Sequence, residues 1–124
     1  MLIGTAQAAA DLLAPLFASA REERIVALHL DAGRRLLALT LEEPGGAGDV
    51  ELPVLLILQR ALRIGSHAII LAHNHPSGDP EPSEADRMAT AALADAARAV
   101  GLRLDDHIVF GGSEWVSFRG LGLM

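Results

Sequence analysis

The feature that most constrains the fold is the stretch from His67 to Asp86, in which a short apolar run passes directly into a loop rich in Pro, Gly, Ser and Asp. Residues 68–72 are aliphatic and are followed at once by turn-forming residues, so we expect a buried strand that enters a tight polar loop. Ser83 then begins Ser-Glu-Ala-Asp ahead of an Ala-rich segment, which is the pattern of a capped helix N-terminus. The sequence therefore predicts a strand, a loop and a helix in succession.

Three side chains at the two ends of this loop carry the donor atoms of a metal site. His73 and His75 are two residues apart, so a strand that persists that far presents both imidazoles on one face. Asp86, one turn into the helix, can turn back towards them. Two imidazoles and a carboxylate suit zinc, and three protein ligands leave the fourth tetrahedral position open to water. The alternative is that the histidines are polar strand-end residues and that Ser83 and Asp86 only cap the helix.

The spacing His-x-His, seven residues, Ser, two residues, Asp matches the JAMM motif of MPN-type metalloproteases at His73, His75, Ser83 and Asp86. A closer resemblance, to the C-terminal domain of the bacterial RadC family, rests on HNHPSGDPEPSEAD and, downstream, on DHIVFGG and SFRGLGL. It covers the chain from about Arg24 to the C-terminus. The resemblance implies a zinc-dependent hydrolase that cleaves an amide or isopeptide bond of a protein or peptide, with Ser83 donating to the developing oxyanion.

The general base is the point at which the chain departs from this pattern. In JAMM proteins a Glu on an upstream strand takes the proton of the attacking water, and the resemblance puts Thr40 at that position. Glu42 lies two residues further along and faces the same side of the strand, so it is our first candidate for the base. Glu43, Glu51 or no working base at all are the alternatives. Two other functions therefore stay open: a catalytically silent MPN-type module that binds a protein partner, and an accessory factor in DNA repair.

Size and composition narrow these hypotheses. With 124 residues, 51% of them hydrophobic, the chain is expected to form a single domain over residues 1–124 with a proper core. The absence of Cys excludes disulfides, Cys-ligated zinc, thiol catalysis and the zinc signature of the nucleotide deaminases. We expect the helix-hairpin-helix domain that RadC proteins usually carry to be absent. No apolar run has the length of a membrane span, and we predict a cytoplasmic protein.

The charge of the chain bears on the DNA hypothesis. The net charge is −6, all ten basic residues are Arg, and there are only three Phe, one Trp and no Tyr, so neither a basic patch nor a surface for base stacking is apparent. We expect weak, non-specific binding to DNA, because an acidic protein is repelled by phosphate and releases few counterions. A fluorescence anisotropy titration of duplex DNA at physiological salt checks this, and nanomolar binding would contradict it.

Hydrophobic periodicity and turn residues predict the remaining elements. We expect a helix within residues 1–20 capped by Thr5 and bent or ended by Pro15, antiparallel strands at 24–31 and 35–42, a flexible loop at 44–49, a helix at 53–64 ended by Gly65, the strand at 68–72, a helix at 83–100 ended by Gly101, and antiparallel strands at 102–110 and 114–118. This order indicates an α/β fold with a mixed sheet flanked by helices on both faces. The resemblance implies the same, a three-layer architecture like that of MPN domains and cytidine deaminases.

The packing of each helix can also be predicted. The first helix is interpreted as a lid on one sheet face or, because it is so apolar, as the contact of a homodimer. The helix at 53–64 is apolar on nearly every side, so we expect it to be buried behind the central strand. The longest helix is expected to approach the sheet through small and apolar residues, namely Met88, Ala91, Ala92 and Val100.

Four polar residues outside the motif are interpreted as structural. His29 lies among aliphatic residues, where a lone His is more often hydrogen-bonded than a ligand, so it is left out of the site. Asp105, Asp106 and His107 could add to a metal site, but they stand at a strand start, where acidic residues are ordinary. A partner of a metal ligand is the alternative for Asp106 and His107, and the structural hydrogen bond is preferred.

Overall fold

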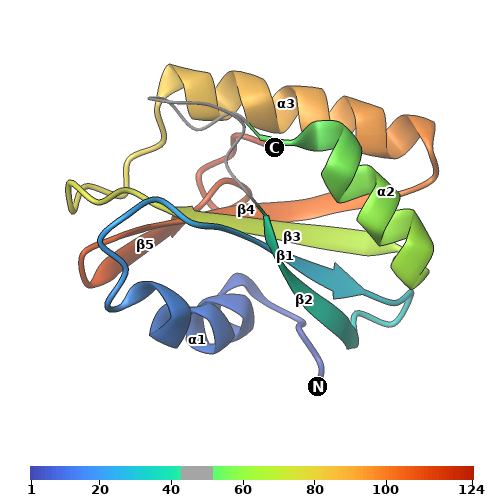
Figure 1. Cartoon of the computed structure of the whole chain (residues 1–124), viewed down its shortest axis with the longest axis horizontal. Coiled ribbons are helices and arrows are strands. Elements are labelled where there is room, and N and C mark those ends of the chain that lie inside the picture. Colours follow the sequence, from blue (N-terminus) through green and yellow to red (C-terminus); the bar gives the residue numbers. More distant parts are fainter. Residues whose placement is uncertain (43–51) are drawn as a thin grey trace.

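The computed structural model describes residues 1–42 and 52–124, which form a five-stranded sheet covered by helices (Figure 1). The strand order is β2-β1-β3-β4-β5. Along the chain the elements are α1 (Ala6–Phe17), β1 (Ile25–Leu30), β2 (Leu36–Glu42), α2 (Val54–Ile64), β3 (Ala68–Asn74), α3 (Glu84–Ala99), β4 (Arg103–Gly111) and β5 (Glu114–Ser117).

The sheet is mixed, because it contains both antiparallel and parallel pairs of strands. β1 pairs antiparallel with β2 and with β3, β4 pairs antiparallel with β5, and β3 pairs parallel with β4. Parallel neighbours need a long crossover connection, which α3 supplies. All seven residues of β3 are buried, as expected for a central strand with both faces covered. The sequence predicted two antiparallel hairpins, one on each side of the motif, and a buried strand within it. All three are confirmed.

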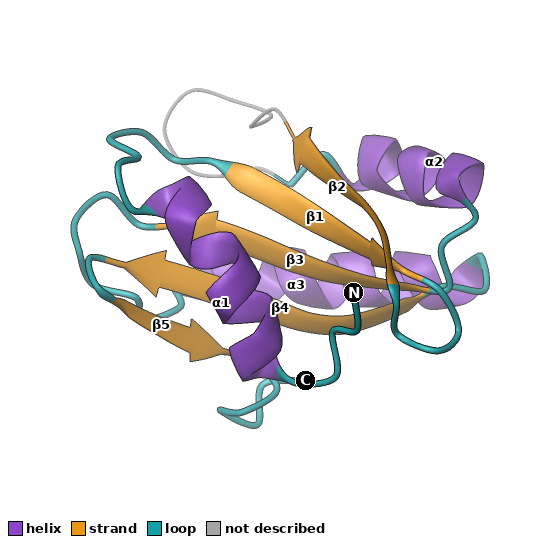
Figure 2. Cartoon of the chain, turned by 90° about the horizontal axis from the view of Figure 1, so that it is seen from below, coloured by secondary structure: helices purple, strands orange, loops and turns teal. Residues whose placement is uncertain are grey.

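The helices lie on both faces of the sheet, as the sequence predicted. Figure 2 shows α1 across the near face, with α2 and α3 on the far side. Each face has its own hydrophobic cluster: α1 packs against Val26, Leu28 and Ile70, whereas α2 and α3 pack against Ala27, Ile69 and Leu71. The alternation along β1 and β3 therefore assigns odd-numbered residues to the α2/α3 face.

The first helix is the predicted lid. Thr5 caps it by accepting a hydrogen bond from the Ala8 N–H at 3.1 Å. Pro15 lies within the last turn, and the helix ends two residues later at Phe17. Phe17 is buried and stacks on Phe110 of β4 with ring centroids 4.8 Å apart, so the end of α1 is fixed over the sheet.

The prediction that the second helix is buried behind the central strand was wrong. α2 contacts β1, β2 and α3, which puts it over one side of the sheet. Only Ile57, Leu58 and Ala61 are buried, while Leu55 is 70% exposed and Leu62 is 53% exposed. A helix near the edge of a sheet has neighbours on one side only. The apolar residues on its other side therefore stay exposed, however apolar the sequence is. Its C-terminus is as predicted, since Gly65 adopts the left-handed conformation with φ of 84°.

The predicted inward face of α3 was also wrong. Met88 is 68% exposed and Val100 is 45% exposed, and the side chains that face the sheet are Asp86, Thr90, Leu93 and Ala97. These four recur at the helical spacing of three or four residues. The Ser83 cap and the inward turn of Asp86 set the rotation of the helix, and Thr90, Leu93 and Ala97 follow on the same side.

The predicted loop at 44–49, together with Glu43 and Glu51, lies outside the described residues. Within residues 1–42 and 52–124, no helix has both the length and the apolar character needed to cross a membrane.

Candidate metal centre

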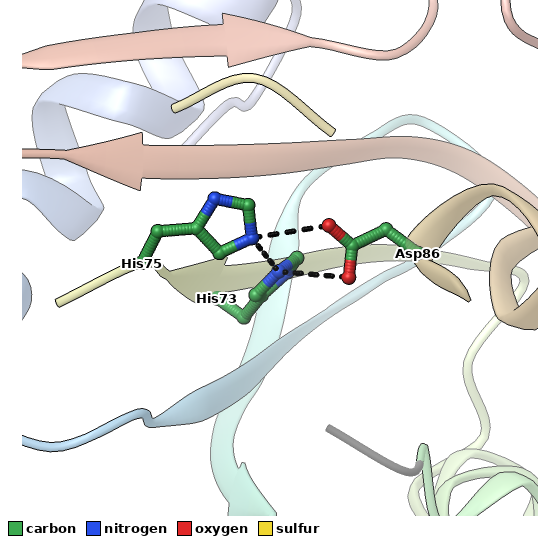
Figure 3. Close-up of side chains that lie close together, drawn as sticks. All are labelled: His73, His75 and Asp86. Carbon is green, nitrogen blue, oxygen red and sulfur yellow. Dashed lines mark hydrogen bonds and ion pairs between the residues drawn. The ribbon is translucent and has the colours of Figure 1, made fainter. Parts of the chain in front are cut away.

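The two histidines of the motif lie at the C-terminal end of β3. His73 is fully buried in the strand on the α2/α3 face. His75 follows just beyond Asn74, and its N–H donates to the carbonyl of Phe110 at 2.7 Å, so the chain keeps to the edge of β4. Figure 3 shows both rings turned towards the same point, as the two-residue spacing predicted.

The start of α3 supplies the third side chain. Ser83 and Asp86 form a reciprocal cap: the Asp86 N–H donates to Ser83 Oγ at 3.0 Å, and the Ser83 N–H donates to Asp86 Oδ2 at 2.9 Å. This confirms Ser83 as the helix cap. It also fixes the Asp86 carboxylate at the end of β3, where it faces both imidazoles (Figure 3).

The three side chains have the spacing of one coordination sphere. His73 Nε2 and His75 Nε2 are 3.2 Å apart, His75 Nε2 and Asp86 Oδ2 are 3.0 Å apart, and His73 Nε2 and Asp86 Oδ1 are 3.4 Å apart. Ligand atoms about 2.0–2.1 Å from a tetrahedral zinc stand about 3.3 Å from one another. The predicted ligands His73, His75 and Asp86 are therefore brought together at the separations that a metal ion of this size requires.

The protons around the cluster favour a cation between the three groups. His75 Nδ1 lies 2.8 Å from the carbonyl oxygen of Asp79, which can only accept, so this nitrogen carries a proton. In the neutral ring Nε2 then has a bare lone pair, yet it faces the acceptor-only carboxylate of Asp86 at 3.0 Å. Two acceptors at that distance need a positive charge between them, either a proton or a metal ion.

Asp86 is held in the ionised form that binds metal. Burial opposes its ionisation, but hydrogen bonds from His73 and from the Ser83 N–H outweigh burial and hold the pKa of Asp86 well below its usual range. A carboxylate that is already deprotonated can bind a cation without first losing a proton.

Comparison with known proteins agrees with the fold and the motif. Residues 3–123 match the family model described as a RadC-like JAB domain. The chain belongs to the RadC family. It is 37% identical over 118 residues to the UPF0758 protein YfjY of Escherichia coli K12, a match that covers 95% of this chain and 74% of the relative. It is 41% identical over 102 residues to a UPF0758 protein of Rhodobacter capsulatus, covering 82% of this chain but only 48% of that protein.

Of the polar residues interpreted as structural in this RadC-family domain, three fit that interpretation fully. Asp105 is buried and accepts a hydrogen bond from Arg34 Nη1 at 2.8 Å. His29 is buried, with Nδ1 3.0 Å from Ser66 Oγ and Nε2 2.9 Å from Thr40 Oγ1. Asp106 accepts hydrogen bonds from the N–H groups of His107 and Arg119, at 2.8 and 3.1 Å, and thereby ties the end of the chain to β4.

For His107 the structural interpretation was incomplete. Its Nε2 lies 2.7 Å from His73 Nδ1, directly behind a candidate metal ligand. Its ring is fully buried and stacks on Phe118, with centroids 4.7 Å apart. Burial, followed by the electrostatic effect of the neighbouring His73, keeps the pKa of His107 well below its usual value, so the ring is neutral.

Glu42, the predicted general base, lies on the correct face of the sheet but one strand away from the histidines. It pairs with Ile25 of β1, and Ile25 pairs in turn with His73. Its carboxylate accepts hydrogen bonds from Thr40 Oγ1 at 2.7 Å and from Arg60 Nη1 at 2.9 Å. Thr40 and Glu42 thus share a face, as predicted, and Glu42 stays a candidate for the general base.

A second carboxylate, which the sequence analysis missed, belongs to the segment just before β1. Glu23 lies two residues before Ile25, the residue of β1 that pairs with His73. The Asn74 side chain holds this segment, because its Oδ1 accepts from the Arg24 N–H at 2.7 Å and its Nδ2 donates to the Glu22 carbonyl at 3.1 Å. Glu23 itself is partly buried. The sequence signal that could have identified Glu23 is an acidic residue just before a predicted strand that can pair with β3, the strand of the motif.

Proposed function

We propose that this domain is a zinc-dependent hydrolase that cleaves an amide or isopeptide bond of a protein or peptide. The observation that supports it is the convergence of His73, His75 and Asp86 at separations of 3.0–3.4 Å. The His75 side chain is 18% exposed, so the cluster is reachable from solvent. Zinc bound there would lower the pKa of a water molecule to about 7 and polarise a carbonyl group.

In this proposal the chain supplies a base and an oxyanion donor. Glu23 takes the proton from the attacking water and passes it to the leaving amine. Two observations support this role: Glu23 lies two residues before the β1 residue that pairs with His73, and Asn74 fixes the backbone on both sides of it. The Ser83 hydroxyl donates to the developing oxyanion. Accepting a hydrogen bond from the Asp86 N–H leaves the hydroxyl proton of Ser83 available for this role.

Glu42 is the second candidate for the base, and the contacts around it favour a structural role. Its carboxylate accepts hydrogen bonds from Thr40 and Arg60, and these contacts hold it one strand away from the histidines. If neither glutamate acts as a base, the domain is a catalytically silent module that binds a protein partner. The net charge of −6 speaks against the third possibility, a factor that acts on DNA.

Glu23→Gln is expected to keep zinc and to lower turnover about a hundredfold or more, the usual size of a general-base contribution. Glu42→Gln is the matched control and is expected to retain most of the activity. The measurement is mass spectrometry of new amino groups released from a proteome-derived peptide library that includes lysine-branched peptides, with zinc-loaded and chelator-treated protein compared.

The outcomes separate the candidates. Loss of activity in Glu42→Gln with full activity in Glu23→Gln would return the base to Glu42. Cleavage that survives chelation would reject metal-dependent hydrolysis. No cleavage by zinc-loaded native protein, in a library that covers linear and branched amides, would favour the silent module.

A further inference from the structure

A series of hydrogen bonds runs behind the candidate metal site and joins α3, β4 and β3. The Thr90 hydroxyl donates to the backbone carbonyl of Asp86 at 2.7 Å. The same oxygen lies 2.6 Å from His107 Nδ1, and His107 Nε2 lies 2.7 Å from His73 Nδ1. Thr90, His107 and His73 are all buried, so water does not compete for these bonds.

The position of each proton in this series of hydrogen bonds follows from its first acceptor, the backbone carbonyl of Asp86. A carbonyl oxygen can only accept, so the single hydroxyl proton of Thr90 is used on Asp86, and Thr90 Oγ1 offers a lone pair to His107. His107 Nδ1 therefore carries the proton of its neutral ring, and His107 Nε2 accepts. The proton between the two imidazoles then belongs to His73 Nδ1, which leaves His73 Nε2 as the metal-binding nitrogen.

We propose that Thr90 is a positioning residue which, through His107, selects the tautomer of His73 that can bind a metal ion. The inference rests on the proposed metal site and adds a determinant two hydrogen bonds away from it. A metal-binding imidazole is generally fixed by the group that its other nitrogen contacts. In this chain that group is another imidazole, which could equally donate or accept, so an outside residue must decide between the two. Thr90 is that residue.

Removal of the hydroxyl frees His107 to reverse its protons. Val has nearly the shape of Thr but neither donates nor accepts, so in Thr90→Val the His107 Nδ1 proton loses its acceptor. The other tautomer of His107, protonated on Nε2, then donates to His73 Nδ1. A neutral His73 is left with its proton on Nε2, pointing at the metal position, and binding must first remove or move that proton.

The test compares Thr90→Val, Thr90→Ser and Leu93→Val. Affinity for zinc is measured by competition with a chromophoric chelator, and the visible spectrum of the cobalt-loaded protein reports the ligand geometry. We expect Thr90→Val to bind zinc about 10–100-fold more weakly, the usual effect of removing a partner of a metal ligand. Thr90→Ser, which keeps the hydroxyl, and Leu93→Val, which loosens the same buried face of α3 one turn later, should stay within about threefold of the native protein.

Long-range ¹H–¹⁵N spectra of the histidine rings supply a readout that loosened packing would not move. In the native chain, with or without zinc, His107 is expected to be protonated on Nδ1 and bare on Nε2, and this assignment should be lost in Thr90→Val and retained in Thr90→Ser. A native His107 protonated on Nε2, or native affinity in Thr90→Val, would overturn the proposal. If the native protein shows the expected His107 tautomer but has no affinity for zinc, the metal site is rejected, whereas the hydrogen bonds between Thr90, His107 and His73 are confirmed.

Discussion

His75→Ala or Asp86→Ala is expected to abolish zinc binding, whereas His67→Ala is expected to bind about one zinc ion per chain like the native protein. Removing one of three ligands leaves too few donors for a stable site, and the neighbouring acceptors cannot replace it. His67 is an exposed histidine just before β3, at the opposite end of the strand from the cluster. Metal content after dialysis, measured by plasma mass spectrometry, distinguishes the variants.

Circular dichroism controls for unfolding of these variants. His75 is partly exposed at the end of its strand, so its replacement should leave the helical signal intact, whereas Asp86→Ala also removes one half of the helix cap. Asp86→Asn keeps the shape of the side chain while weakening the ligand, and serves as a second variant. Stoichiometric zinc in both His75→Ala and Asp86→Asn would contradict the assignment of the ligands.

Gly111→Ala is expected to disturb the metal site from outside it. A Cβ at Gly111 would collide with the nitrogen of Pro80 and stand 2.6 Å from the carbonyl carbon of Asp79, both backbone atoms of the motif loop. The loop must therefore move, and the Asp79 carbonyl that accepts from His75 Nδ1 moves with it. We expect a loss of about 1–3 kcal/mol in unfolding free energy from overpacking. Zinc affinity should fall about 10–100-fold as His75 loses its orienting partner.

Gly4→Ala is the matched control for Gly111→Ala. No heavy atom lies within 4 Å of a Cβ placed at Gly4, so this substitution should leave both stability and zinc affinity close to native. Urea denaturation gives the first quantity and chelator competition the second. Equal stability and equal zinc affinity of the two alanine variants would mean that the motif loop does not pack closely against Gly111.

The sequence predicts best those features that depend on neighbouring residues. The Ser83 cap, the left-handed Gly65 and the shared face of His73 and His75 all follow from local patterns, and all are found. The burial of α2 was misjudged because its sequence is as apolar as that of a core helix, whereas Leu55 and Leu62 lie on its exposed side. Composition does not report how many sides of a helix find neighbours.

The missed parts of the site depend on contacts between distant segments. Glu23 became a candidate only because β1 pairs with β3 and Asn74 holds the segment around it. Neither contact is visible in a sequence pattern that locates the base on the second strand of the hairpin. Likewise, His107 reaches His73 because β4 is parallel to β3, with an irregularity between Ile69 and Ile70 that shifts the pairing. Such shifts are set by the packed sheet and have no local signal in the sequence.

Anomalous X-ray diffraction recorded on both sides of the zinc absorption edge, from crystals of the native chain, tests the metal site most directly. We predict one peak per chain, about 2.0–2.2 Å from Nε2 of His73, Nε2 of His75 and a carboxylate oxygen of Asp86, with a remaining position open to solvent. Crystals grown with excess zinc that show these three side chains ordered and no anomalous peak between them would contradict the account.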